Sequence, residues 1–266
     1  MIRISELHYY PIKSCHGTSP DQAEIGLRGI KGDREFMLVD ERGLFITQRD
    51  NSRLSLIYPE WREETLILKA PGRTPFYHRP HSRGLTTIVE IWGDRCSAID
   101  QGDETARWLN DFLGISCRLV QISEESIRRT DPVYRHKDED QISFSDGFPF
   151  LLISETSLSD LNGRVEVPVP VDRFRPNIVI TGADPYAEDR WKRIRIGKIE
   201  FTVAKSCERC MVTTIDQETG MTGHEPLRTL SRYRRLSNGK VVFGQNLIHH
   251  GTGHICVGDS VEVLAG

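Results

Sequence analysis

The sequence lacks the features that mark a secreted or membrane-spanning protein. Residues 1–12 have neither the basic start nor the continuous apolar core of a signal peptide. No apolar run approaches the roughly 18 residues that a membrane-spanning helix needs. Only six cysteines occur in 266 residues, and they are scattered except for one pair, so a disulfide framework is not expected. We therefore expect a protein of the reducing cytoplasm, without a membrane partner.

The sequence also lacks a large excess of charge of one sign. Its 35 basic and 38 acidic residues give a formal charge of −3, and 38% of the residues are apolar. Nucleic acids and anionic membranes attract proteins with concentrated positive charge, so no nucleic acid is expected as a partner either. A chain of this length can form one large domain or two modest ones, each with a core.

Short strand-like runs dominate what the sequence does contain. Residues 2–9 alternate between apolar and polar, with a change of phase that indicates a bulge in the first strand. Further strand-like runs occur at residues 36–39, 66–68, 88–91, 177–180 and 241–243.

Three segments have the apolar spacing of helices: 103–113, 155–161 and 226–233. The first has Asp103 as its expected N-cap and Gly114 as its stop signal. Many strands beside few helices favour a strand-dominated barrel or sandwich over alternating βαβ units. We therefore predict a mainly β fold with a few helices (α+β).

A domain boundary is expected between residues 123 and 140. This segment is polar, is poor in periodic apolar residues and ends in a charge run at residues 136–140. The simplest interpretation of the charge run is a solvated linker. The sequence therefore predicts two domains, residues 1–122 and 123–266.

Two thiols lie three residues apart within residues 205–216, at Cys207 and Cys210. The neighbouring Lys205 and Arg209 favour the thiolate, which is the form that binds soft metals or attacks electrophiles. Such a pair can serve a zinc site, a redox-active dithiol or a single metal ligand.

Each of these interpretations has its own requirement. A closed zinc site needs four ligands, and His249, His250 and His254 do not have the spacing of a familiar zinc motif. A thioredoxin-like dithiol begins a helix, whereas residues 211–215 favour β structure and predict an extended segment. A single thiolate could bind a metal whose other ligands come from a cofactor. The spacing permits this third arrangement without establishing it.

Basic and polar residues lie at the ends of several predicted strands. Lys13 and Ser14 follow the first strand, and a lysine with a hydroxyl is a common way to hold a phosphate. Arg34 and Arg49 flank the strand 36–39 and its expected hairpin partner, where two guanidinium groups could converge on one anion. From spacing alone, an exposed turn or a surface ion pair is the simpler interpretation.

Two later loops carry further polar pairs. Ser145 and Asp146 precede an apolar run, and a carboxylate beside a redox centre could relay protons. Arg175 and Asn177 open the strand 177–180. If that segment is extended, their side chains point to the same face and could bind one ligand together. Until another observation links these loops, a turn or surface position remains the simpler interpretation.

Considered together, these motifs resemble those of a known family. They lie at residues 11–17, 32–34, 47–49, 172–177, 207–216 and 243–246. In order and context they are similar to the MOSC-domain molybdenum enzymes, specifically the group of the mitochondrial amidoxime-reducing component and the bacterial N-hydroxylaminopurine-resistance reductases. The resemblance runs from the first strand to the last. It implies an MOSC N-terminal β-barrel-like domain at 1–122 and an MOSC β-barrel domain that binds the molybdenum cofactor at 123–266.

The resemblance also implies a site. Its cofactor is a pterin-bound molybdenum (Mo-molybdopterin) whose metal is held by one protein cysteine, here Cys210, the second cysteine of the C-x-R-C motif. The other implied cofactor contacts are Lys13, Ser14, Arg34, Ser145, Arg175, Asn177 and Arg209. Asp146 joins Cys210 as an implied catalytic residue that positions substrate or passes a proton. Glu208 departs from the serine frequent at its position in the family and is left out of the predicted site.

The implied activity is a molybdenum-dependent reductase, with a role in detoxification, that removes oxygen from N-hydroxylated bases, amidoximes and hydroxylamines. The chain has no iron–sulfur cysteine spacing and ends after the strand-like run 261–264. Electrons are therefore expected from a separate flavoprotein reductase, with or without an iron–sulfur or haem carrier. The alternative is a non-catalytic carrier of the molybdenum cofactor, or of persulfide sulfur on Cys207 or Cys210.

Overall fold

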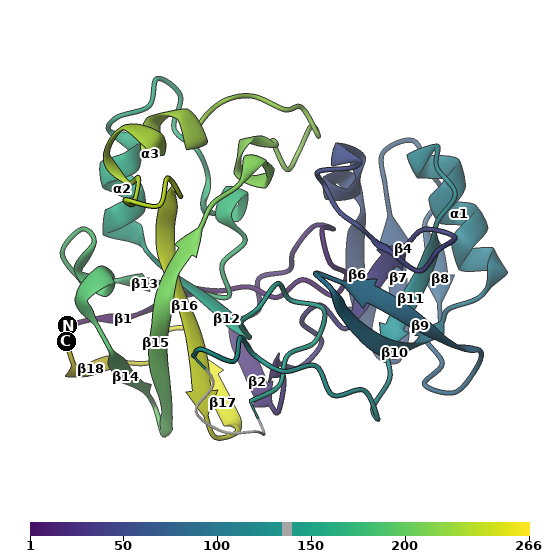
Figure 1. Cartoon of the computed structure of the whole chain (residues 1–266), viewed down its shortest axis with the longest axis horizontal. Coiled ribbons are helices and arrows are strands. Elements are labelled where there is room, and N and C mark those ends of the chain that lie inside the picture. Colours follow the sequence, from purple (N-terminus) through teal and green to yellow (C-terminus); the bar gives the residue numbers. More distant parts are fainter. Residues whose placement is uncertain (135–139) are drawn as a thin grey trace.

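The structure is a computed structural model that describes residues 1–134 and 140–266. Strands dominate it and form two lobes that lie side by side, with both chain termini at the outer edge of one lobe (Figure 1). Three α-helices accompany the strands of the described residues. The predicted mainly β fold with a few helices is therefore confirmed. Residues 136–139 of the charge run that we interpreted as a linker lie outside the described residues.

The lobe that carries both termini is built on a seven-stranded sheet. Its strands, in spatial order, are β1 (Arg3–Leu7), β13 (Ile178–Thr181), β12 (Phe150–Ser154), β16 (Val242–His250), β15 (Ile199–Glu208), β14 (Arg193–Ile196) and β18 (Val261–Ala265). Neighbouring strands are antiparallel except β12 and β13, which are parallel. The sheet curls until its two edges meet. Two hydrogen bonds join these edges: Ile4 N donates to Asp259 O at 2.9 Å, and Val261 N donates to Ile2 O at 3.0 Å.

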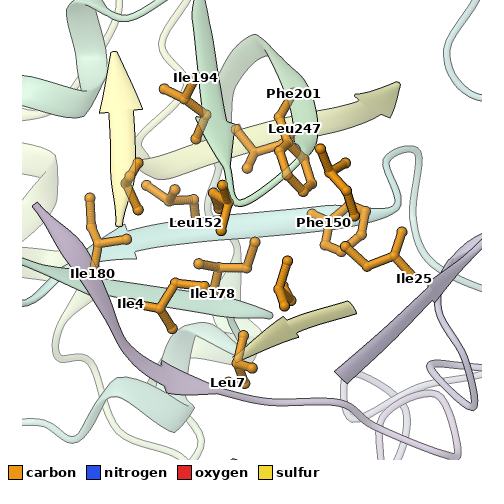
Figure 2. Packing of buried hydrophobic residues seen from close by; sticks show 14 of the residues in the cluster. Ile4, Leu7, Ile25, Phe150, Leu152, Ile178, Ile180, Ile194, Phe201 and Leu247 are labelled. Carbon is orange, nitrogen blue, oxygen red and sulfur yellow. The ribbon is translucent and has the colours of Figure 1, made fainter. Parts of the chain in front are cut away.

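Apolar side chains fill the space that these strands enclose. Phe150, Leu152 and Ile178 point toward Phe201 and Leu247 across this core (Figure 2), and each of the five is at most 1% exposed. Full burial of a side chain of this size stabilises a fold by about 1.5–3 kcal/mol. The core therefore fixes the strand ends, and loops at those ends carry several of the predicted site residues, including Ser145, Arg175 and Cys210.

The other lobe contains a five-stranded sheet. Its spatial order is β5 (Phe45–Ile46), β4 (Phe36–Val39), β11 (Arg118–Ile122), β10 (Asp94–Asp100) and β9 (Thr86–Ile91). A parallel bridge between Leu44 and Glu90 joins its first and last strands, so this sheet also curls toward closure. A three-stranded sheet of β6 (Tyr58–Arg62), β7 (Thr65–Lys69) and β8 (Phe76–His78) shares the lobe.

The α-helices lie close to where the sequence predicts them. They are α1 (Asp103–Leu113), α2 (Glu155–Asn162) and α3 (Leu227–Tyr233). Helix α1 ends at Gly114, which adopts the left-handed conformation with φ 72° that suits a C-cap. Its N-cap is Gly102 rather than Asp103, so that part of the prediction is wrong by one residue. Asp103 lies in the first turn, where its negative charge complements the helix dipole.

The predicted extended segment 211–215 is wrong. Residues Met211–Thr214 form the 3-10 helix η4 instead, one of four such turns in the described residues. The Thr213 hydroxyl donates to Cys210 O at 3.0 Å and the Thr214 hydroxyl donates to Met211 O at 2.7 Å. Threonine favours strands, but here its hydroxyl satisfies local carbonyls and stabilises a turn. The other 3-10 helices are η1 (Ser52–Leu56), η2 (Val171–Phe174) and η3 (Ala187–Arg190).

The first strands of the chain belong to the lobe formed by its second half. β1 pairs with β13, and its register shifts between Ile4 and Glu6, which confirms the predicted bulge. β2 (Gln22–Gly26) pairs with β17 (Gly253–Cys256) and β3 (Gly29–Ile30) in a further small sheet. In Figure 1 the purple β1 and β2 accordingly lie among green and yellow strands. The predicted domain boundary between residues 122 and 123 remains a prediction. Because β1 and β2 pair with β13 and β17, the two lobes do not correspond to two continuous halves of the sequence.

Candidate functional site

One cavity of about 550 Å³ brings the predicted site residues together. They reach it from five segments: the turn after β1, the turn before β4, the loop before β12, the connection from η2 to β13, and the connection from β15 to η4. The predicted residues that line the cavity are Lys13, Ser14, Arg34, Ser145, Asp146, Arg175, Asn177, Arg209 and Cys210. Arg49 and Asn246 line it as well. None of the nine predicted positions is therefore an isolated surface turn.

Lys13 and Asp146 form an ion pair in the cavity wall. The lysine side chain is 7% exposed, whereas the carboxylate side chain is 66% exposed toward the cavity. Lys13 Nζ donates to Asp146 Oδ1 and, at 2.9 Å, to Phe144 O. Burial lowers the pKa of Lys13 to about 8, even though the carboxylate favours its charged form. Desolvation raises the pKa of Asp146, but the charge and hydrogen bond of Lys13 outweigh it and hold that pKa well below its usual range.

Arg34 and Arg175 lie near the same aromatic ring. Their guanidinium carbons are 4.4 Å and 4.1 Å from the centre of the Tyr10 ring, within the range of a cation–π contact. Arg34 Nη1 also donates to Asp33 Oδ2 at 2.6 Å, whereas Arg175 Nη1 donates to Cys15 O at 2.7 Å. Burial lowers the pKa of Arg175. A guanidinium nevertheless stays charged in proteins, so both residues contribute positive charge to the cavity.

The conformation of Arg175 differs from the prediction. The sequence suggested an extended segment that places Arg175 and Asn177 on one face, but Arg175 is left-handed, with φ 56° and ψ 50°. The cause is η2, which ends at this residue through a bond from Arg175 N to Asp172 O at 3.0 Å. Arg175 and Asn177 still line the same cavity, although not by strand alternation.

Asn177 is occupied by hydrogen bonds within the protein. Its side chain is buried, with the residue 1% exposed. Asn177 Oδ1 accepts from Arg34 Nη1 at 3.1 Å and from Leu151 N at 3.2 Å, and Nδ2 donates to His8 O at 3.2 Å. Asn177 therefore acts on the cavity by holding Arg34 in place.

Each of the two neighbouring cysteines has an arginine at its sulfur. Cys210 precedes η4, and its Sγ accepts a hydrogen bond from Arg49 Nη2 at 3.1 Å. Cys207 lies near the end of β15, and its Sγ accepts from Arg209 Nη1 at 2.9 Å. All six cysteines are free thiols. The sulfur of Cys210 is thus fixed in the cavity wall by a residue from the other lobe.

The cavity has the charge and the unpaired polar groups that suit an anionic ligand. The side chains of Lys13, Arg34, Arg49, Arg175, Lys205, Arg209 and Lys240 give it seven positive groups, against the acids Asp131, Asp146 and Glu208. Ser145 Oγ, Arg175 Nη2 and Arg209 Nε are buried and have no hydrogen-bond partner among the described residues. Buried polar groups without a partner are rare, so three in one cavity wall fit a polar ligand. A pterin with a phosphate and a thiolate-bound metal has that chemistry.

No metal site made from protein side chains alone is present in the part of the chain that the structure describes. These residues contain no group of three or more His, Cys, Asp or Glu side chains that could hold an ion. The closed zinc interpretation therefore finds no support there. A metal at Cys210 would take its remaining ligands from a cofactor.

Sequence reasoning missed Trp92, which lines the cavity from the turn between β9 and β10. Its Nε1 donates to Asp146 Oδ1 at 3.0 Å, and its ring lies 5.0 Å from Arg49 Cζ. The Trp92-Gly93 pair directly follows the predicted strand 88–91, a position that is typical of a turn. The available signal was a large aromatic residue at a position where turns favour small polar residues.

Comparison with known proteins identifies the domains. Residues 1–116 match the MOSC N-terminal beta barrel domain, and residues 139–262 match the MOSC domain. The chain is 39% identical over 285 residues to "Mitochondrial amidoxime-reducing component 1" of Mus musculus, an alignment that covers 98% of this chain and 82% of the relative. The protein of the same name from Homo sapiens is 37% identical, with the same two coverages. "Molybdenum cofactor sulfurase" of Oryza sativa subsp. japonica is 32% identical over 91% of this chain and 32% of its own length.

The predicted cytoplasmic location is contradicted by these relatives, because the mouse and human proteins are named as mitochondrial. The absence of a secretory signal does not test for mitochondrial import, which uses amphipathic, arginine-rich segments. Among the described helices, none has the length and apolar character needed to cross a membrane. By its two domain matches and its identity to relatives along nearly its whole length, the chain belongs to the MOSC-domain family that includes the mitochondrial amidoxime-reducing components.

Proposed function

We propose that the chain binds a pterin molybdenum cofactor in this cavity and reduces N-hydroxylated compounds such as amidoximes, hydroxylamines and N-hydroxylated bases. The observation that carries the proposal is the convergence of nine residues from five segments on one cationic cavity with a cysteine sulfur in its wall. The printed names of the mouse and human relatives, amidoxime-reducing components, support the same reaction class.

In this proposal the protein holds the cofactor at two ends. Cys210 Sγ is the protein ligand of the metal, because a thiolate is a soft donor. The anionic pterin and its phosphate are bound by Lys13, Ser14, Arg34, Ser145, Arg175 and Arg209. Asn177 contributes by fixing Arg34. When bound, the cofactor supplies the two-electron chemistry that removes oxygen from nitrogen.

Asp146 serves the substrate rather than the cofactor. Its carboxylate faces the cavity, and Lys13 beside it favours the ionised form. An ionised carboxylate can accept a hydrogen bond from the N–OH group and orient it, but it has no proton of its own to give to the departing oxygen. Two protons and two electrons are consumed for each water released. The electrons come from a separate flavoprotein reductase, with or without an iron–sulfur or haem carrier.

Metal analysis of three proteins tests whether Cys210 is the protein ligand of the metal. Wild type, Cys210→Ser and Cys207→Ser are produced in a host that makes the molybdenum cofactor. Molybdenum content and benzamidoxime reduction with a chemical electron donor are then measured. Cys210→Ser should lose both, whereas Cys207→Ser is a matched control in the same cavity and should keep most of both. Equal loss from the two substitutions would contradict a single-cysteine ligand and favour a shared dithiol site.

A second candidate function is a carrier of the molybdenum cofactor or of persulfide sulfur. The similarity to the rice molybdenum cofactor sulfurase supports this second candidate, although the chain spans only about a third of that relative. Cys207 Sγ, held by Arg209, is a suitable place for such sulfur. Metal-free protein with labile sulfur, and no amidoxime reduction, would favour the carrier of persulfide sulfur.

A further inference from the structure

The Trp92 backbone is unusual for so large a residue. Trp92 and Gly93 form the tip of the β9–β10 hairpin, and both have positive φ, 54° and 85°. Tight hairpin turns of this kind favour asparagine, aspartate or glycine at the first position. The left-handed conformation costs other L-residues roughly 1–2 kcal/mol. The residue is also 49% exposed, so burial of its ring does not explain why tryptophan occupies the turn.

The contacts of Trp92 point toward the site. Its Nε1 donates to Asp146 Oδ1, the same oxygen that Lys13 binds. Among the residues that the structure describes, none forms a hydrogen bond with Asp146 Oδ2. The two donors therefore hold one oxygen of this cavity-lining carboxylate and leave the other available to accept from a ligand.

The same hairpin tip also braces the backbone of Asp146. Asp94, two residues after Trp92, forms an ion pair with Arg128 at 3.0 Å. The Arg128 side chain is buried and donates to Ser145 O, and to Asp146 O at 3.2 Å. The hairpin thus fixes Asp146 through both its side chain and its main chain.

On the other side of the ring, Trp92 reaches Arg49. The guanidinium carbon of Arg49 is 5.0 Å from the ring, and Phe45 packs against the ring at 4.8 Å between centroids. Arg49 in turn donates to Cys210 Sγ. Trp92 therefore contacts Asp146 directly and is linked to Cys210 through Arg49.

We propose that Trp92 is a positioning residue that holds Asp146 Oδ1, so that Oδ2 is presented to the N–OH group of the substrate. This role rests on the proposed reductase function. In this unfavourable turn conformation the tryptophan side chain combines a long reach with an N–H donor that meets Asp146 Oδ1. The charged groups near this carboxylate are Lys13, Arg34, Arg49 and Arg128.

The test compares Trp92→Phe with Trp92→Asn. Phenylalanine keeps a ring but loses the N–H donor, and asparagine suits the left-handed turn but cannot reach the carboxylate. Both variants should melt within a few degrees of wild type and retain molybdenum. Loss of one hydrogen bond to the reacting carboxylate should lower kcat about ten-fold with little change in KM. Trp108→Phe is the matched control, because Trp108 Nε1 donates to Thr74 O, outside the cavity-lining set.

A second measurement does not depend on activity. A ¹³C NMR titration of the Asp146 carboxyl in cofactor-free protein should give a higher pKa in Trp92→Phe than in wild type, because the bond from Trp92 favours the ionised form. An unchanged titration would overturn the inference whatever the enzyme does. A raised pKa with unchanged kcat would also overturn it. Wild type without any N-reductase activity would instead refute the proposed function, and the titration would still report on the contact.

Discussion

Asn177 provides a quantitative test of whether a cavity residue binds the ligand or supports the residues that do. Asn177→Ala removes three side-chain hydrogen bonds, to Arg34, Leu151 and His8. Each such bond contributes about 1 kcal/mol, so the free energy of unfolding should fall by about 3 kcal/mol. For a protein of this size, that corresponds to a melting temperature lowered by roughly 6–12 °C. The melt is measured on cofactor-free protein, so that ligand binding does not contribute.

The matched variant is Asn177→Asp. A carboxylate can still accept from Arg34 Nη1 and Leu151 N, but it places a negative oxygen against His8 O where Nδ2 donated. The free energy of unfolding of Asn177→Asp should therefore lie between that of wild type and that of Asn177→Ala. Cofactor retention should fall in both variants in proportion to the loss of stability. A normal melt of Asn177→Ala together with lost molybdenum would refute this reasoning, because it would make Asn177 a direct contact of the cofactor.

Two further predictions concern a titration and a backbone position. The pKa of Lys13 is lowered to about 8 from 10.5, so between these values the unfolded chain binds more protons at this residue than the folded chain does. The unfolding free energy of cofactor-free wild type should therefore rise relative to that of Lys13→Met as pH increases from 8 to 10.5, and a constant difference in denaturant titrations would contradict the pKa. Gly244→Ala should destabilise the fold by about 2 kcal/mol or more, because φ is 77° and the added Cβ would lie 2.8 Å from Leu152 O. Gly239→Ala, with φ 82° and open space around it, should cost only the conformational part, and equal thermal melts of the two alanine variants would rule out the clash.

The sequence predicted the elements of the fold because hydrophobic periodicity is local information. Short apolar runs identified the strands around residues 36–39 and 88–91, and helical spacing with Gly114 as a stop identified α1. The 3-10 helix η4 was missed because side-chain hydroxyls, rather than periodicity, decide the conformation at Thr213 and Thr214. The left-handed Arg175 was missed for a similar reason, since the end of η2 sets its backbone.

The site was predictable only as a set of motifs. No spacing rule connects Lys13 with Asp146, which are 133 residues apart, or Arg49 with Cys210, which are 161 apart. Resemblance to a family supplied the grouping, and the cavity places all nine residues together. Trp92 was not predicted as a site residue because no local pattern marks it. Its left-handed turn conformation and its hydrogen bond to Asp146 are visible only in the folded structure.

The pairing of β1 with β13 sets an order of events during synthesis. The ribosome releases β1 first, yet its partner emerges some 170 residues later, after every strand of the five-stranded sheet has been made. Closing so long a loop is entropically slow compared with forming local hairpins. Lys13 N bonds to Phe36 O within the early part of the chain, but Arg175, Arg209 and Cys210 complete the cavity around Lys13 only when the last third of the polypeptide has arrived. The cavity that we propose for the cofactor is consequently completed late in synthesis.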